Sequence, residues 1–260
     1  MTNTQHFIQA AGVKSLAEAQ MLARCGVTHV GLPLRLPVHT PDVSEDEARD
    51  IVRGLAAQPG QDRAQTVLIT YLADASETLA LCRFLGVDGV QLHGRMPLPE
   101  VRRLRQAAPG LFIIKSLVVG LAQGANDEAA GQAGDEASLL AQAQAHAPHV
   151  DAFLTDTFAP LSGASGATGK AHDWAVSRRL ALALSLELGR PLILAGGLTA
   201  DNVAQAIACV RPAGVDAHTG LENARGDKDE ALVLRFVAQA KAALAALAPG
   251  PGLAKARDSA

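Results

Sequence analysis

The sequence predicts a single-domain (β/α)8 barrel, an α/β fold, and three observations support this. Its 260 residues suit one such domain, which typically takes about 250 residues. Eight short apolar runs recur along the chain, and segments with helical spacing of apolar residues separate most of them. The runs are continuously apolar, which is typical of parallel strands covered on both faces. An open doubly wound sheet is the alternative, although it less often needs eight parallel strands.

The expected strands are rich in β-branched residues and leucine. In chain order they are Phe7–Val13, Val27–Leu34, Thr66–Leu72, Gly89–His93, Leu111–Val118, Ala152–Thr157, Pro191–Ala195 and Val215–Thr219. The clearest helical segments between them are Ser15–Cys25, Glu45–Ala57, Ser76–Leu85 and Leu98–Ala107. Residues of the types that favour helix N-caps occur at Ser15, Ser44, Ser76 and Asp201.

Two segments interrupt this alternation. Gly120–Gly134 is rich in Gly, Ala, Asn and Asp, and we expect it to form a long surface loop. Pro249–Ala260 combines proline, glycine and charged residues, and we expect a disordered C-terminal tail. The barrel is therefore expected to span residues 1–248, with no linker that divides it.

The composition argues against nucleic-acid and membrane partners. The net charge is −3 and only 3% of residues are aromatic, so a cationic field and base-stacking platforms are both lacking. No apolar run of about 20 residues occurs, and we expect a cytoplasmic protein. Three cysteines are an odd number, which favours a reducing compartment. They fall in expected helices and are interpreted as small buried apolar residues: Cys25, Cys82 and Cys209.

Polar side chains stand near the ends of several expected strands, where the active site of a barrel lies. The candidate substrate contacts are Gln9, Arg35, His93 and Lys115. Asp156 stands between two threonines at a strand end and is the best candidate for a catalytic group. Three other aspartates precede the ends of their strands and are expected at the opposite face, which serves stability: Asp88, Asp151 and Asp216.

Glycine-rich turns follow three neighbouring strands, at Gly166–Gly169, Gly196–Gly197 and Gly220. Such turns let backbone N–H groups approach a bound group closely, and a following helix N-terminus favours an anion. Barrels often bind phosphate between the loops after the seventh and eighth strands. The turns therefore predict a small phosphorylated metabolite as ligand, with tight chain connection as the alternative explanation.

Several segments resemble the phosphoribosylanthranilate isomerase family over about residues 7–243. The resemblance rests on Val90–Gly94, the strand of Asp156, Gly166–Trp174, Leu194–Val203 and Gly214–Asp229. Members of that family are phosphosugar-binding (β/α)8 barrels that perform an Amadori rearrangement in tryptophan biosynthesis, as monomers or dimers. The resemblance implies Asp156 as general acid and a phosphate site that comprises Gly169, Gly196, Gly197, Thr219 and Gly220.

Two positions depart from the pattern of that family. A cysteine at the end of the first strand is the family's general base, and Ala11 stands in its place. The family's arginine for the anthranilate carboxylate also has no match, because Arg35 lies several residues too early. A positioned base contributes about 10²–10⁴-fold, so the ordinary reaction requires a substitute.

His218 stands where the family usually has a small hydroxyl residue. Two roles stay open for it: the replacement base, or a hydrogen-bond donor to a carbonyl or phosphate. Lys115 is expected to position substrate or pair with an anion. A metal site is disfavoured, because its candidate ligands lack paired spacing: His39, His93, His218 and Asp156.

The sequence thus predicts an isomerase that acts on a phosphorylated sugar or sugar-amine, with an altered base and substrate. One alternative is a diverged phosphosugar epimerase or lyase. The other is a non-catalytic barrel that binds a phosphorylated metabolite. No cofactor is expected, and either a monomer or a homodimer fits.

Overall fold

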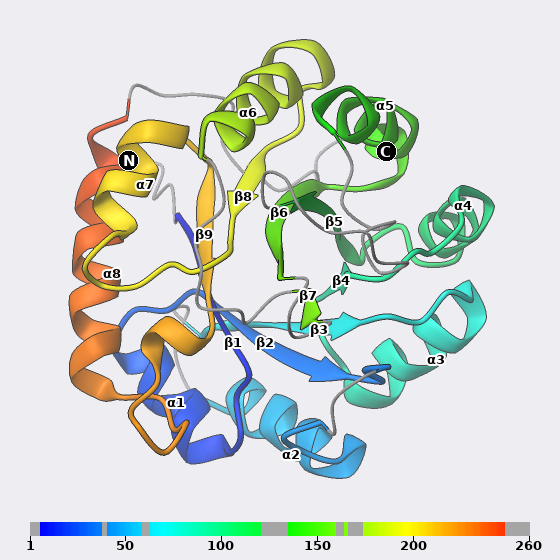
Figure 1. Cartoon of the computed structure of the whole chain (residues 1–260). Helices are drawn as coiled ribbons and strands as arrows, with labels where there is room; N and C mark the ends of the chain where they lie inside the picture. The colour runs from blue at the N-terminus through cyan, green and yellow to red at the C-terminus, as the bar shows by residue number, and fades with distance from the viewer. Residues whose placement is uncertain are drawn as a thin grey trace, which may run out of the picture.

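The computed structural model is a closed barrel of eight parallel strands with helices around it (Figure 1). The structure describes residues 6–37, 41–58, 63–120, 135–159, 164–165 and 174–247, without the side chains at 120, 156–159 and 164–165. The strand order is β5-β4-β3-β2-β1-β9-β8-β6, and pairing of β5 with β6 closes the ring. Closure excludes the open doubly wound sheet, which would keep two unpaired edges.

The strands agree with those expected from the sequence, with ends that differ by a few residues. They are β1 (Phe7–Ala11), β2 (His29–Leu34), β3 (Gln65–Thr70), β4 (Gly89–Leu92), β5 (Phe112–Gly120), β6 (Ala152–Ala159), β8 (Leu192–Leu194) and β9 (Gly214–Ala217). A short strand that the sequence did not predict, β7 (Ala164–Ser165), pairs antiparallel with β6. Gly120 belongs to β5 rather than to a loop, whereas the rest of the expected loop and the expected tail lie outside the described residues.

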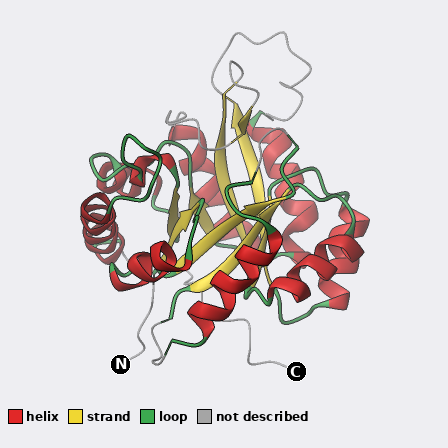
Figure 2. Cartoon of the chain, turned by 90° about the horizontal axis from the view of Figure 1, so that it is seen from below, coloured by secondary structure: helices red, strands yellow, loops and turns green. Residues whose placement is uncertain are grey.

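The helices cover the outer face of the barrel (Figure 2). They are α1 (Leu16–Arg24), α2 (Glu45–Ala56), α3 (Ala75–Leu85), α4 (Leu98–Ala107), α5 (Glu136–His146), α6 (Trp174–Leu188), α7 (Val203–Val210) and α8 (Glu230–Ala245), with 3₁₀ turns η2 (Ala147–His149) and η3 (Thr219–Leu221). In the described parts of the chain, no helix is long and apolar enough to cross a membrane.

Alternation along each strand separates two apolar cores. One fills the barrel interior with Phe7, Val67, Ile114, Ala152, Leu154, Ile193 and Ala195. The other lies between strands and helices and includes the strand neighbours of those residues, such as Ile8, Leu68 and Ile113. Because successive side chains of a strand point to opposite faces, this division fixes which polar strand residues face the interior.

Two of the four expected helix N-caps are confirmed, and two were wrong. Ser15 and Ser44 cap α1 and α2 as expected, and Ser44 forms a reciprocal capping box with Glu47. The cap of α3 is Asp74 rather than Ser76, since the carboxylate of Asp74 accepts from the backbone of Glu77 at 2.9 Å. Asn202, not Asp201, holds the cap position of α7.

Two of the three aspartates assigned to the stability face do lie at the N-terminal ends of strands. Asp88 precedes β4 and pairs with Arg63, at 2.6 and 3.0 Å. Asp151 precedes β6, pairs with Arg105, and accepts from the backbone of Ile113 at 2.7 Å. Each carboxylate therefore joins neighbouring segments at this end of the barrel.

The cysteines are only partly as expected. Cys25 and Cys82 are buried, and burial raises the pKa of the Cys82 thiol to about 12. Cys209 is exposed on α7, so its expected burial was wrong. Helical spacing correctly placed this cysteine on a helix, but it did not show whether it lies on the buried or the exposed face of that helix.

Candidate active site

Buried polar side chains cross the barrel interior near the C-terminal ends of the strands. The amide of Gln9 donates to Gln91 Oε1 at 3.0 Å. His93 Nδ1 lies 3.0 Å from Ser116 Oγ, and its ring contacts Tyr71 edge-on with centroids 4.9 Å apart. Gln9 and His93, two of the predicted substrate contacts, therefore belong to one interior layer.

Asp216 also lies in this interior layer, which corrects its expected place at the stability face. It pairs in register with Gln9 on the neighbouring strand and is buried. Burial raises the pKa of Asp216 to about 6, against the opposing effects of Gln9, His218 and Lys228. Among the described residues, neither Asp216 Oδ1 nor Gln9 Oε1 has a hydrogen-bond partner. A proton on the Asp216 carboxyl would supply the missing donor.

Lys115 and Arg35 do not join the interior layer. Lys115 shares its strand face with Leu117 and Val119 of the outer core, and its Nζ donates to the carbonyls of Leu92 and Gly94. Burial lowers the pKa of this lysine to about 8. Arg35 has a side chain 51% exposed and pairs with Glu45 at the start of α2.

His218 follows β9 and stands directly against Gly12, which follows β1. A Cβ added at Gly12 would lie 2.1 Å from His218 Nε2, so this close approach requires glycine. Register pairs Ala10 with Ala217, which places His218 beside the Ala11 end of the neighbouring strand. The imidazole is thus adjacent to the position where the sequence lacks the expected base.

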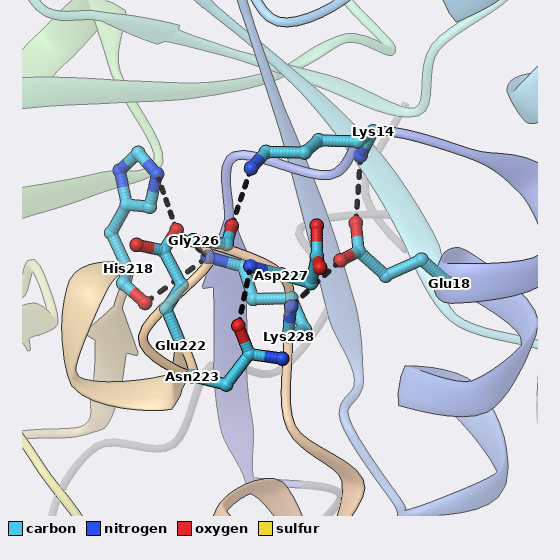
Figure 3. Close-up of polar contacts among 8 residues, drawn as sticks. All are labelled: Lys14, Glu18, His218, Glu222, Asn223, Gly226, Asp227 and Lys228. Carbon is cyan, nitrogen blue, oxygen red and sulfur yellow. Dashed lines mark hydrogen bonds and ion pairs between the residues drawn. The ribbon is translucent and has the colours of Figure 1, made fainter.

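A carboxylate and a lysine surround this histidine (Figure 3). Glu222 Oε1 lies 3.3 Å from His218 Nε2 and 2.8 Å from Lys228 Nζ, and the same Nζ donates to the His218 carbonyl at 3.1 Å. Burial alone would raise the pKa of Glu222, but hydrogen bonds from His218 and Lys228 lower it to about 2. The Glu222 side chain is therefore anionic at neutral pH.

Two segments far apart in sequence hold this cluster together (Figure 3). Lys14, after β1, donates its Nζ to the carbonyl of Gly226, after β9. Glu18 accepts from the backbone N–H of Lys14 at 2.7 Å and from that of Lys228 at 2.9 Å. These bonds fix the loop after β9 to the start of α1.

The turns after β8 and β9 meet each other. A Cβ added at Gly220 would lie 2.0 Å from the Leu198 carbonyl, and Gly196 and Gly197 adopt positive φ values of 96° and 65°. Four backbone N–H groups of these turns donate to no acceptor in the described part of the chain. They belong to Gly196, Gly197, Thr219 and Gly220. Unpaired N–H groups that lie close together favour an anion.

The remaining predicted site residues are placed only in part. Asp156 lies on β6 opposite Val118, and its side chain is outside the described set. Gly169 and His39 also fall outside it. Among the described residues, no group of three potential metal ligands comes together.

A family model described as N-(5'phosphoribosyl)anthranilate (PRA) isomerase matches residues 15–239. The chain belongs to this isomerase family. The N-(5'-phosphoribosyl)anthranilate isomerase 2 of Methanosarcina mazei is 35% identical over 236 residues, which are 90% of this chain and 93% of that protein. The isomerase of Haloferax volcanii is 34% identical over 241 residues, with 92% and 95% covered. Among solved structures, the isomerase of Thermotoga maritima superposes with a TM-score of 0.70 at 25% identity, covering 91% of this chain and 99% of that one.

Sequence reasoning missed three residues of the cluster around His218, and one of them had a readable signal. Glu222 lies four residues after His218, a spacing that brings side chains together on one helical turn. Lys228 gave no such signal, because a loop brings it back to Glu222. Gly12 lies within the expected first strand, Phe7–Val13, with no role assigned to it, and its contact with His218 joins segments far apart in the sequence.

Proposed function

We propose that this member of the family catalyses an Amadori-type aldose–ketose isomerisation of a phosphorylated sugar-amine, with His218 as the base. The observation that carries the proposal is the imidazole of His218 against Gly12, at the end of the strand that neighbours Ala11. Ala11 cannot accept a proton, and an imidazole can do so near neutral pH. The curated relatives are named for N-(5'-phosphoribosyl)anthranilate, which is therefore the first substrate to test.

In the proposed reaction, proton transfers to and from the enzyme balance. Asp156 donates a proton to the ring oxygen as the bond between that oxygen and C1 breaks, and the amine nitrogen forms a double bond to C1. His218 then removes the proton from C2, which gives an enol-amine that tautomerises to the aminoketose. Acid–base chemistry suffices for these steps, so the proposal needs no metal or organic cofactor.

The proposed phosphate site uses backbone donors rather than side-chain cations. Its candidate donors are the N–H groups of Gly196, Gly197, Thr219 and Gly220, which bond to no acceptor among the described residues, with Gly169 as a further candidate. Gln9 and His93 would contact the remainder of the substrate from the interior layer. Arg35 and Lys115 are bonded elsewhere, which supports a changed receptor for the non-phosphate part of the substrate. We also propose that the protein is cytoplasmic, that it is a monomer or a homodimer, and that it acts in tryptophan biosynthesis.

Loss of substrate fluorescence tests the proposal, with N-(5'-phosphoribosyl)anthranilate generated in situ. We expect turnover by the wild-type protein, and loss of kcat by about 10²–10⁴-fold in both Asp156→Asn and His218→Ala. Affinity for inorganic phosphate should stay unchanged in both variants. Asp201→Asn, at an exposed carboxylate outside the site, is the matched control.

Other outcomes would select the alternatives. Turnover that appears only in Ala11→Cys would mean an intact acid and phosphate site but a different natural phosphosugar, as in a diverged epimerase or lyase. Phosphate binding without turnover in any variant would favour a non-catalytic binding barrel. Full activity of His218→Ala would exclude His218 as the base.

A further inference from the structure

The carboxylate of Glu222 lies between a histidine and a buried lysine at the C-terminal end of the barrel (Figure 3). We propose that Glu222 is a positioning residue that keeps the hydrogen of neutral His218 on Nε2, so that Nδ1 is the proton acceptor. This assignment rests on the base role proposed for His218 and deepens it. The family's usual small hydroxyl residue at this position offers no ring for such a carboxylate to orient.

The two ring nitrogens of His218 have different surroundings. Nε2 is 3.3 Å from Glu222 Oε1, whereas Nδ1 has no hydrogen-bond partner among the described residues. A neutral imidazole carries one N–H and one lone pair, so a bond that holds the hydrogen on Nε2 leaves the lone pair on Nδ1. The same carboxylate stabilises the imidazolium after proton transfer, as the aspartate of a catalytic triad does.

Packing restricts the ring in the same orientation. The atoms nearest to a Cβ built at Gly12 are Nε2, Cδ2 and Cε1 of His218, so this edge of the imidazole faces the backbone. Nδ1 is not among them. A ring flip would move Nε2 away from Glu222 and break the contact between them.

Lys228 keeps the carboxylate ionised and in place. Its side chain is fully buried, and it donates to both Glu222 Oε1 and the His218 carbonyl. Both hydrogen bonds come from one ammonium group, so the carboxylate and the backbone of the histidine are held at a fixed separation. Glu222 therefore stays charged over the whole range in which an imidazole titrates.

The other charged groups near the imidazole either bond to other residues or lie buried in the interior layer. Asp216 faces it from β9 and is buried in the interior layer. Lys14 and Glu18, from the segment after β1, bond to Gly226 and to the backbone of Lys228. Glu222 is thus the carboxylate that contacts the ring among the described residues.

The test compares Glu222→Gln in the wild-type and His218→Ala backgrounds, in the full-length protein. In the wild-type background, kcat should fall by about tenfold to a hundredfold with KM within twofold, because the base is present but loses its orientation. The acid limb of the kcat/KM profile should also move to lower pH, since an uncharged neighbour disfavours the imidazolium. In the His218→Ala background, the same change should cause no further loss. Independent, multiplicative losses would overturn the proposal.

A second measurement does not depend on turnover. Nitrogen NMR of labelled wild-type protein at alkaline pH should find His218 with its hydrogen on Nε2, and a hydrogen on Nδ1 would overturn the assignment. A wild-type protein with no turnover but with this tautomer would reject the proposed function and retain the orienting role of Glu222. Asp88→Asn, which removes a similar paired carboxylate at the other end of the barrel, is the control that should keep the tautomer and kcat unchanged. Should the Gln variant fail to fold, Lys228→Met removes the ammonium group that holds the Glu222 carboxylate; it should lower kcat in the wild-type background and cause no further loss in the His218→Ala background.

Discussion

Paired carboxylates occur at both ends of the barrel, but they differ in what their partners leave free. At the N-terminal end, Asp88 accepts from two nitrogens of Arg63 and also from the backbone and hydroxyl of Thr66. At the C-terminal end, Glu222 is shared by Lys228 and by His218, whose second ring nitrogen has no partner among the described residues. A saturated pair can only hold chain segments together. A pair that leaves one basic atom free can also move a proton.

A substitution at Gly12, which contacts the His218 imidazole at the C-terminal end, should reduce turnover most. Gly12→Ala should lower kcat by about 10²-fold or more, because its methyl group would lie 2.1 Å from His218 Nε2 and displace the imidazole. Steady-state turnover of the phosphoribosyl substrate measures this.

Gly86→Ala is the matched control for that prediction. Gly86 has the same kind of positive φ, 78° against 75° at Gly12, but the nearest atom to its added Cβ is 3.9 Å away. Both variants should lose about 1–2 kcal/mol of stability from the left-handed backbone conformation. Equal kcat values in the two would remove His218 from the mechanism.

The next effect concerns Asp216 in the interior layer. It is an effect on folding stability, and it depends on pH. The folded protein holds a proton on Asp216 up to about pH 6, whereas the unfolded chain releases it near the ordinary value of 3.8. Stability from this group therefore falls as pH rises between those values, by up to about 3 kcal/mol. Asp216→Asn removes that loss, so the variant should gain stability relative to wild type as pH rises from 4 to 7, in urea titrations read by circular dichroism. A constant difference across this range would show that Asp216 is ionised in the folded protein.

Asp88 should have the weakest effect, and its contribution to stability changes with pH in the opposite direction to that of Asp216. Hydrogen bonds from Arg63 and Thr66 outweigh burial and lower the pKa of Asp88. Its contribution is therefore present above the unfolded value and is lost as the pH falls through the folded one. Asp88→Asn should cost about 1–2 kcal/mol at neutral pH, less in acid, and leave kcat unchanged. A large loss of kcat would mean that the two ends of the barrel are coupled.

The fold could be predicted because length, strand–helix alternation and apolar content all agree. The face of a single strand residue could not, and Lys115 shows why. Its strand is apolar on both faces, so alternation carries no information about which face points inward. Asp216 was assigned to the wrong end because the sequence does not set the stagger of β9 against β1.

The site was partly predictable for a similar reason. Chain order brings the turns after β8 and β9 to neighbouring strand ends, and both were expected to form one site. The contact of His218 with Gly12 joins residues about two hundred positions apart and follows only from ring closure. Local spacing can suggest Glu222 as a partner, but it cannot supply the backbone glycine that lets the ring approach.

The bonds that join Lys14 to Gly226 and Glu18 to Lys228 also bear on biosynthesis of the enzyme. Strand β1 and its following segment leave the ribosome long before β9, so the imidazole cannot stand against Gly12 until translation has passed the last strand. A nascent chain, or one that has lost these bonds by local unfolding, lacks the contact between His218 and Gly12 on which the proposed base depends. In the proposed mechanism turnover therefore depends on completed barrel closure, and it should disappear before helix content does when the protein is gently denatured.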